Sequence, residues 1–182
     1  RQMGIRDSLK IIQRINCHGI AFLSGLLTEN AKDSLQAITE KTPVTIKKRE
    51  SDHKETILFC GFPCSFKVKH TGGISQWFLL LKSSSILLDY QKKSRSFQDT
   101  NSSYNKLFET ILKTYNGDFL DASSHGDSKK QLFIQYEETD WEFIIRAASR
   151  IGSAVFPDPS SQQPRLYLGL PKGTTFQEPK IR

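Results

Sequence analysis

The stretch QLFIQYEETDWEFIIRAASRIG, residues 131–152, joins a strand pattern to a helix pattern with a sharp boundary between them. In its first part Leu132, Ile134 and Tyr136 alternate with Phe133 and Gln135. Alternation of this kind is typical of a β-strand, and the apolar residues at odd and even positions predict that both faces are at least partly covered.

The second part of the stretch carries the start, face and end of a helix. Thr139 and Glu142 match a capping box, in which each side chain caps the backbone amide of the other residue. The following apolar residues are spaced to lie on one helical face: Trp141, Ile144, Ile145, Ala148 and Ile151. Gly152 is expected to end this helix.

A second helix is predicted over residues 102–116, where Asn101 or Ser102 is the expected cap and Gly117 follows the end. Its apolar face consists of Tyr104, Leu107, Phe108, Ile111, Leu112 and Tyr115. Residues 118–130 are predicted to be a polar loop, and 155–156 and 165–170 to be short strands. Residues 96–170 are therefore expected to form an α/β domain with two helices on a small sheet, and 171–182 a tail or linker to a missing segment.

Residues 1–95 are predicted to form short strands separated by turns. The expected strands are 9–16, 20–27, 44–48, 57–60, 66–68 and 77–81, with breaks at Gly61 and Pro63 and with 86–88 resuming after Ser83–Ser85. His70–Gly73 is expected to be a turn, and 47–54 a solvated connection. Residues 28–42 suit either a short helix or a hairpin arm. This spacing favours a small antiparallel barrel or sandwich, so that the whole chain belongs to the α+β class.

Positive charge is concentrated in the first half of the chain, which has a net charge of +7 over its 182 residues. Residues 1–95 hold 16 Lys and Arg against 8 Asp and Glu, whereas residues 96–182 hold 10 against 11. A basic strand-rich half suggests an anionic partner, either an acidic protein surface or an anionic polymer such as nucleic acid or a glycan. The cationic stretch 47–54 contains no aromatic residue of the kind that stacks on bases.

Candidate catalytic or metal-binding groups each have a simpler structural interpretation. Cys17, His18, Cys60 and Cys64 offer donor atoms for zinc but lack the two closely spaced pairs that are typical of such sites. The acidic cluster of residues 137–142 lies where acids cap a helix and favour its dipole. Residues alone therefore favour a structural or interaction protein without metal or cofactor.

Three segments resemble motifs of one family, the VgrG (valine-glycine repeat protein G) and phage late control gene D proteins, which form the baseplate hub of contractile injection systems. Residues 83–89 resemble a serine followed by a leucine-rich turn into aspartate, and 94–99 resemble an Arg-x-Phe-Gln segment before a helix. Residues 135–146 resemble its Gln-Tyr-x-Glu-Thr-Asp motif. The matching residues are Asp89, Arg95, Phe97, Gln98, Gln135, Tyr136, Glu138, Thr139, Asp140, Phe143, Arg146 and Gly152.

This resemblance, which covers most of residues 12–170, implies a non-enzymatic hub protein. It implies a tube-like first barrel over 1–95, a homotrimer in the full-length protein, and tail tube and spike proteins as partners, whereas nucleic acid is not expected. The second barrel of the family is absent from these residues. We expect no membrane span and no signal peptide, hence cytoplasmic assembly into a phage-like particle or secretion apparatus. Tyr136 and Phe143 are expected in the core, and Arg95 and Arg146 are expected to pair with Asp140 or Asp89.

Overall fold

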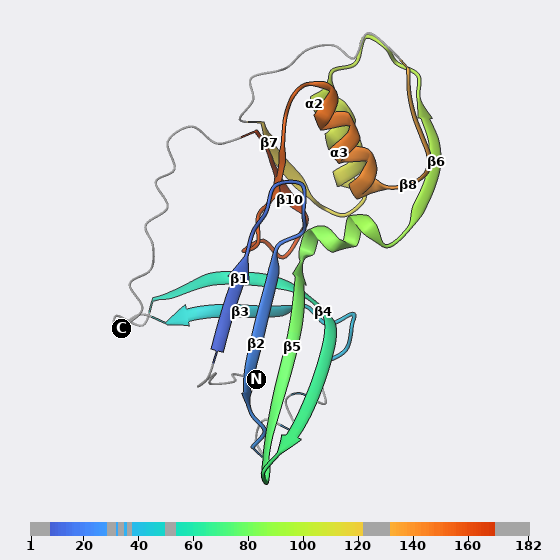
Figure 1. The fold of residues 1–182 in the computed structure, drawn as a ribbon. Helices are drawn as coiled ribbons and strands as arrows, with labels where there is room; N and C mark the ends of the chain where they lie inside the picture. The colour runs from blue at the N-terminus through green and yellow to red at the C-terminus, as the bar shows by residue number, and fades with distance from the viewer. Residues whose placement is uncertain are drawn as a thin grey trace.

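A computed structural model of the chain describes residues 8–28, 32, 35, 38–49, 54–121 and 132–169. It combines a curled antiparallel sheet with a helix-containing part (Figure 1). The predicted α+β class is confirmed. The tail at 171–182 lies outside the described residues, as do 29–31, 33–34 and 36–37 of the segment 28–42, for which two alternatives were open; Leu35 in that segment is helical and buried.

The barrel-like part is one five-stranded sheet that curls into a half-barrel. All its neighbouring strands are antiparallel, in the order β1-β2-β5-β4-β3. The strands are β1 Ser8–Ile12, β2 Ile20–Leu26, β3 Val44–Arg49, β4 Glu55–Thr71 and β5 Ile74–Ser83. The predicted turn joins β4 to β5 through Gly72 and Gly73, whose φ angles of 56° and 78° lie in the region that glycine tolerates best.

Strand β4 is continuous, so the predicted break at Gly61 and Pro63 is wrong. The register against β5 shifts between Pro63 and Ser65, which leaves Cys64 as the extra residue of a bulge. A bulge tolerates proline, which has no amide hydrogen for the ladder. Gly61 is required where the strands come close, because a Cβ atom there would lie 2.1 Å from the carbonyl oxygen of Lys82.

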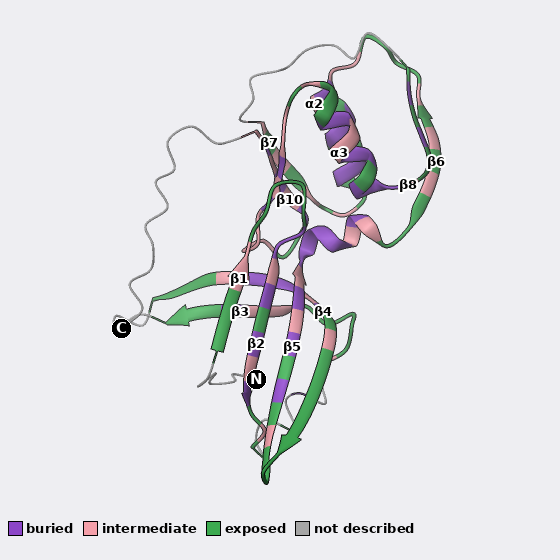
Figure 2. Cartoon of the chain, viewed as in Figure 1, coloured by how far each residue is buried: buried purple, intermediate pink, exposed green. Residues whose placement is uncertain are grey.

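The inner face of the half-barrel carries its own apolar core. The buried residues come from β2, β3, β4, β5 and the residue at position 35, and are Ala21, Leu23, Leu35, Ile46, Phe59, Trp77, Leu79 and Leu81. Buried and exposed residues alternate along β2 and β5 (Figure 2). This alternation is the period that a sheet covered on one face imposes.

The second part packs two helices between two small sheets. A 3-10 helix, Ser84–Asp89, leads into it, followed by β6 Lys92–Phe97, α2 Tyr104–Lys113, β7 Asp118–Asp121, β8 Phe133–Thr139, α3 Asp140–Arg150, β9 Val155–Pro157 and β10 Arg165–Leu168. One sheet has the order β7-β10-β9 and the other pairs β6 with β8. The helices contribute most of a second core, which includes Phe108, Ile111, Phe143 and Ile144.

Three predictions for this part need correction. Residues 86–88 lie in the 3-10 helix and do not resume a strand. Residues 118–121 form strand β7 and not part of a loop. Pairing with β10 supplies the hydrogen bonds of this strand, and the local sequence does not indicate that pairing. Helix α2 is capped by Ser103, whose side chain accepts from the amide of Lys106, and not by Asn101 or Ser102. The division at residue 95 remains a prediction, and β6 spans it.

Candidate functional site: a buried carboxylate and the junction of the two parts

Asp140 is the most enclosed charged group in the described chain, with a fully buried side chain at the first turn of α3. Its Oδ2 accepts from Lys93 Nζ at 2.7 Å and from the Tyr115 hydroxyl at 2.7 Å. Its Oδ1 accepts from the Arg95 guanidinium at 2.6 Å and from Gln135 Nε2 at 3.0 Å. Two cations and two neutral donors therefore surround one carboxylate.

The surroundings of Asp140 keep it ionised. Burial penalises the charge, but hydrogen bonds from Lys93, Tyr115 and Gln135, together with the charge of Arg95, outweigh this penalty and lower the pKa of Asp140. The amide dipoles at the start of α3 act in the same direction. Because each carboxylate oxygen already accepts two hydrogen bonds, the cluster links β6, the segment after α2, β8 and α3 through one buried group.

The capping box continues this polar network to the half-barrel. The Thr139 side chain accepts from the amide of Glu142, and Glu142 accepts from the amide of Thr139, as predicted. The Thr139 hydroxyl also donates to Asp89 Oδ1 at 2.6 Å. Asp89 ends the 3-10 helix, so the start of α3 is tied to the segment that leaves β5.

His18 lies on the other side of the same junction. Its ring lies 4.3 Å from Trp141 of α3, Nδ1 lies 2.9 Å from the Ser85 hydroxyl, and Nε2 lies 3.4 Å from Asp89. Burial lowers the pKa of His18, although Asp89 opposes this effect. A lowered pKa favours the neutral form of the ring, whose two nitrogens face Ser85 and Asp89.

Further hydrogen bonds join the two parts at their backbones. Asn16 exchanges bonds with Val155, the amide of Cys60 donates to Pro159, and the Ser84 hydroxyl lies 2.8 Å from the carbonyl oxygen of Ser161. In the second part, these contacts come from β9 and from the segment between β9 and β10. The junction therefore connects the half-barrel to the second part at more than one place.

The predicted ion pairs are partly confirmed. Arg95 contacts Asp140, as one of the alternatives held. Arg146 does not reach Asp140 or Asp89: it contacts both carboxylate oxygens of Glu138, at 2.8 and 2.7 Å, and donates to the carbonyl oxygen of Ile134. The reason is that Asp140 is already enclosed by four donors, whereas Glu138 is in reach on β8.

The remaining motif residues have different surroundings. Phe143 is fully buried and stacks on Phe97 at 5.4 Å, as expected for core residues. Tyr136 is 73% exposed, so its placement in the core is wrong: it lies on the open face of the two-stranded β6–β8 ribbon. Gln98 is exposed and contacts only Ser96 in the described part. Gly152, with φ 64°, follows α3.

The candidate zinc donors are not brought together. Cys17 and Cys64 are exposed, Cys60 is buried beside Thr45, and His18 is engaged at the junction. Within the described ranges, no three His, Cys, Asp or Glu side chains are placed to share a metal ion. The acidic cluster has the capping and ion-pairing role expected for it.

Sequence reasoning missed Lys93, Tyr115 and the environment of His18. Lys93 and Arg95 are two residues apart on one strand, and this spacing was an available signal that both point to the same face. Tyr115 was assigned to the apolar helix face, where its ring does contact the core while its hydroxyl reaches Asp140.

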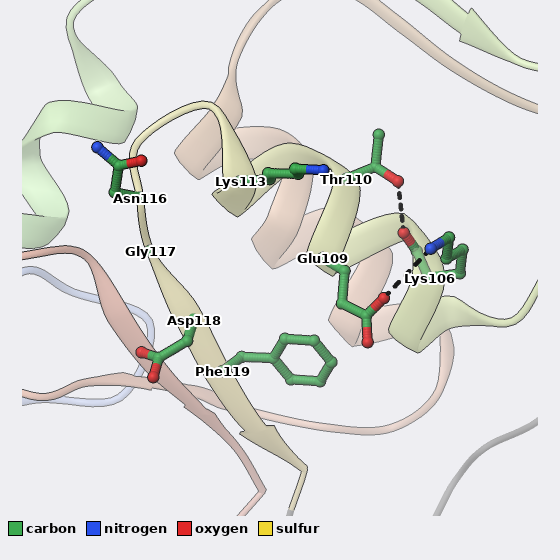
Figure 3. A pocket seen from close by; sticks show the side chains of 8 residues that line it. All are labelled: Lys106, Glu109, Thr110, Lys113, Asn116, Gly117, Asp118 and Phe119. Carbon is green, nitrogen blue, oxygen red and sulfur yellow. Dashed lines mark hydrogen bonds and ion pairs between the residues drawn. The ribbon is translucent and has the colours of Figure 1, made fainter.

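A large surface groove of about 840 Å³ lies between the polar side of α2 and the start of β7 (Figure 3). Lys106 and Glu109 form an ion pair at 3.6 Å, and the Thr110 hydroxyl donates to the Lys106 carbonyl. These side chains satisfy one another and do not converge on one point, so the groove lacks the geometry of a catalytic site.

Comparison with known proteins finds no matching family model and no matching curated protein. Solved structures do match. A protein of Escherichia coli, described as a component of the type VI secretion system that is structurally similar to the T4 bacteriophage tail proteins gp27 and gp5, is 12% identical with a TM-score of 0.58; the match covers 90% of this chain and 47% of that chain. The 43 kDa tail protein of prophage MuSo2 from Shewanella oneidensis is 13% identical with a TM-score of 0.59, covering 88% and 50%.

A third match is a chain of a PdpA–VgrG complex of Francisella, at 16% identity and a TM-score of 0.52, over 88% of this chain and 26% of that chain. The chain thus spans about half or less of the structures that it matches. At these identities the comparisons show the fold, which is the VgrG-like baseplate hub fold that the motifs indicated.

Proposed function

We propose that this chain is part of a structural baseplate hub of a phage tail-like contractile injection system, in which the full-length protein trimerises and joins the tail tube to the spike. The observation that carries the proposal is the fold match over 84–90% of the chain to tail and type VI secretion proteins. These structural neighbours are tail components, which supports a role without catalysis.

The site supports the same proposal. Five of the twelve motif residues, Asp89, Arg95, Gln135, Thr139 and Asp140, meet in the Asp140 cluster and at the junction beside it. Hydrogen bonds join the half-barrel to the helical part at several points, and a connection of this kind suits a structural component that holds its neighbours in place.

The cellular place follows from the proposal. Such a protein assembles in the cytoplasm and becomes part of a particle or secretion apparatus. None of the described helices has the length and apolarity that a membrane span needs.

The test is reconstitution of the full-length protein with the tail tube and spike proteins encoded beside it. Size-exclusion chromatography is expected to yield a complex that contains all three, and omission of the hub protein should leave tube and spike apart. Tube and spike that join equally well without the hub protein would refute the proposal.

A second candidate function, binding of an anionic polymer by the basic half-barrel, is favoured by Lys10, Lys67, Lys69 and Lys82 of this sheet, which have no carboxylate partner among the described residues. Its expected signature is affinity for single-stranded DNA that falls steeply with salt.

A further inference from the structure

The outer face of the half-barrel has an apolar centre that no described residue covers. Register pairs place Phe22 of β2 opposite Leu80 of β5, and Phe78 of β5 opposite Ser24 of β2, all on the face away from the core. Phe22 and Phe78 are 43% and 40% exposed. A groove of about 260 Å³ runs over these side chains. Exposed aromatic clusters of this kind mark interaction surfaces.

Lysines surround this centre. Lys10 of β1 pairs in register with Phe22, Lys67 of β4 pairs with Phe78, and Lys82 of β5 pairs with Ile20, so these side chains share the outer face. Lys69, opposite Gln76, extends the rim. No Asp or Glu occurs in β1, β2, β5 or residues 65–71 of β4.

Several other cations of the described surface are already paired with carboxylates of this chain. Glu55, Glu109, Asp118 and Glu138 each hold an ion pair with a cation of this chain. Within the described ranges, the lysines at 10, 67, 69 and 82 have no such partner. Unpaired cations around an apolar centre are complementary to carboxylates around an apolar centre.

We infer that the outer face, defined by Lys10, Phe22, Lys67, Phe78, Leu80 and Lys82, binds an acidic amphipathic surface of a different protein. The partner places apolar side chains over Phe22 and Phe78 and carboxylates opposite the lysines. In a second copy of the described part, Glu55, Glu109, Asp118 and Glu138 are already paired and so are not free to face these lysines; self-association is therefore one outcome of the test. The inference specifies the chemistry of one docking face. It rests on the proposed hub function only for which protein of the assembly is the partner.

The test uses a fluorescent peptide of alternating Glu and Leu, whose anisotropy is followed as the chain is added at low and at high salt. Peptides of alternating Glu and Ser, and of alternating Lys and Leu, test the apolar and the acidic requirement, and single-stranded DNA tests the polymer alternative. We expect the Glu-Leu peptide to bind most tightly and to weaken at high salt.

Variants locate the site. Lys10→Glu with Lys67→Glu is expected to weaken the Glu-Leu peptide about tenfold, from the loss of two exposed charge contacts and the repulsion that replaces them. Phe78→Ser is expected to weaken binding of the Glu-Leu peptide several-fold, because it removes an apolar contact of the proposed face. Phe78 is exposed, so its replacement does not remove core packing. Lys92→Glu with Lys106→Glu changes the net charge equally on the second part and should leave binding unchanged.

Several results would overturn the inference. These are no binding of the Glu-Leu peptide, equal loss in the control variant, DNA binding at least as tight, or a self-association of the chain that the Lys10 and Lys67 variant abolishes. Each variant is checked by circular dichroism, so that a fold defect is not taken for a binding defect. A full-length protein that still joins tube and spike without peptide binding would refute this docking face alone.

Discussion

Replacement of Asp140 by asparagine removes the charge at the centre of the buried cluster while it preserves the size of the side chain. In the Asp140→Asn variant one oxygen becomes an amide nitrogen, which faces donors and cannot accept from them. Lys93 and Arg95 lose their anion, and the Tyr115 hydroxyl or Gln135 loses its acceptor.

The cost of this change follows from burial. Breaking a buried ion pair by removing one partner costs about 3–5 kcal/mol. The Lys93 and Arg95 side chains are 22% and 30% exposed, so water solvates part of the charge left behind. We therefore expect the free energy of unfolding to fall by about 2–4 kcal/mol, a large share of the roughly 5–15 kcal/mol of a typical domain.

The measurement is urea unfolding of the wild-type chain and the variant, monitored by circular dichroism. The slope of the unfolding free energy against urea concentration is compared to verify that both unfold in the same way. Asp118→Asn is the matched control, because Asp118 forms an exposed ion pair with Arg165. It should cost about 1 kcal/mol or less. A loss below about 0.5 kcal/mol at Asp140, or an equal loss at Asp118, would refute the central role of the cluster.

Other predictions concern pH, pairing and packing. The pKa of Asp140 is lower in the folded state, so the unfolded state binds more protons as the pH falls below the ordinary value of 3.8. The free energy of unfolding of the wild type should therefore fall as the pH drops through that region, and that of Asp140→Asn should fall less. Urea titrations at a series of pH values measure this, and an equal pH dependence of the two proteins would contradict it. A double-mutant cycle should give a coupling of about 1–3 kcal/mol between Arg95 and Asp140 and nearly none between Arg95 and Asp89, and the reverse order would contradict the observed pairing. Gly61→Ala should lower the free energy of unfolding by about 1–3 kcal/mol because its Cβ would meet the Lys82 carbonyl, and a neutral effect on the urea midpoint would show that β4 and β5 can separate at little cost.

Local signals in the sequence predicted local structure well. The capping box at Thr139 and Glu142 and the apolar face of α2 depend on residues three or four positions apart, and both are confirmed. The turn at Gly72 and Gly73 is confirmed for the same reason.

The cap of α2 was missed locally, by one residue from Ser102, but three other errors and omissions involve distant segments. Tyr136 has the alternation of a buried strand, yet the ribbon it belongs to is covered on one face only. Strand β7 forms because it pairs with β10, which lies about 50 residues further along the sequence. The Asp140 cluster joins Lys93, Arg95 and Tyr115 to α3. Lys93 and Arg95 share a face of β6, but no local pattern shows that Asp140 and Tyr115 meet them there.

The most direct test of the hub proposal is mass photometry of the full-length protein, alone and with its tail tube and spike proteins. The proposal predicts a particle with the mass of three copies, and a shift to the mass of a joint complex when both partners are added. A strict monomer that never joins either partner would contradict it.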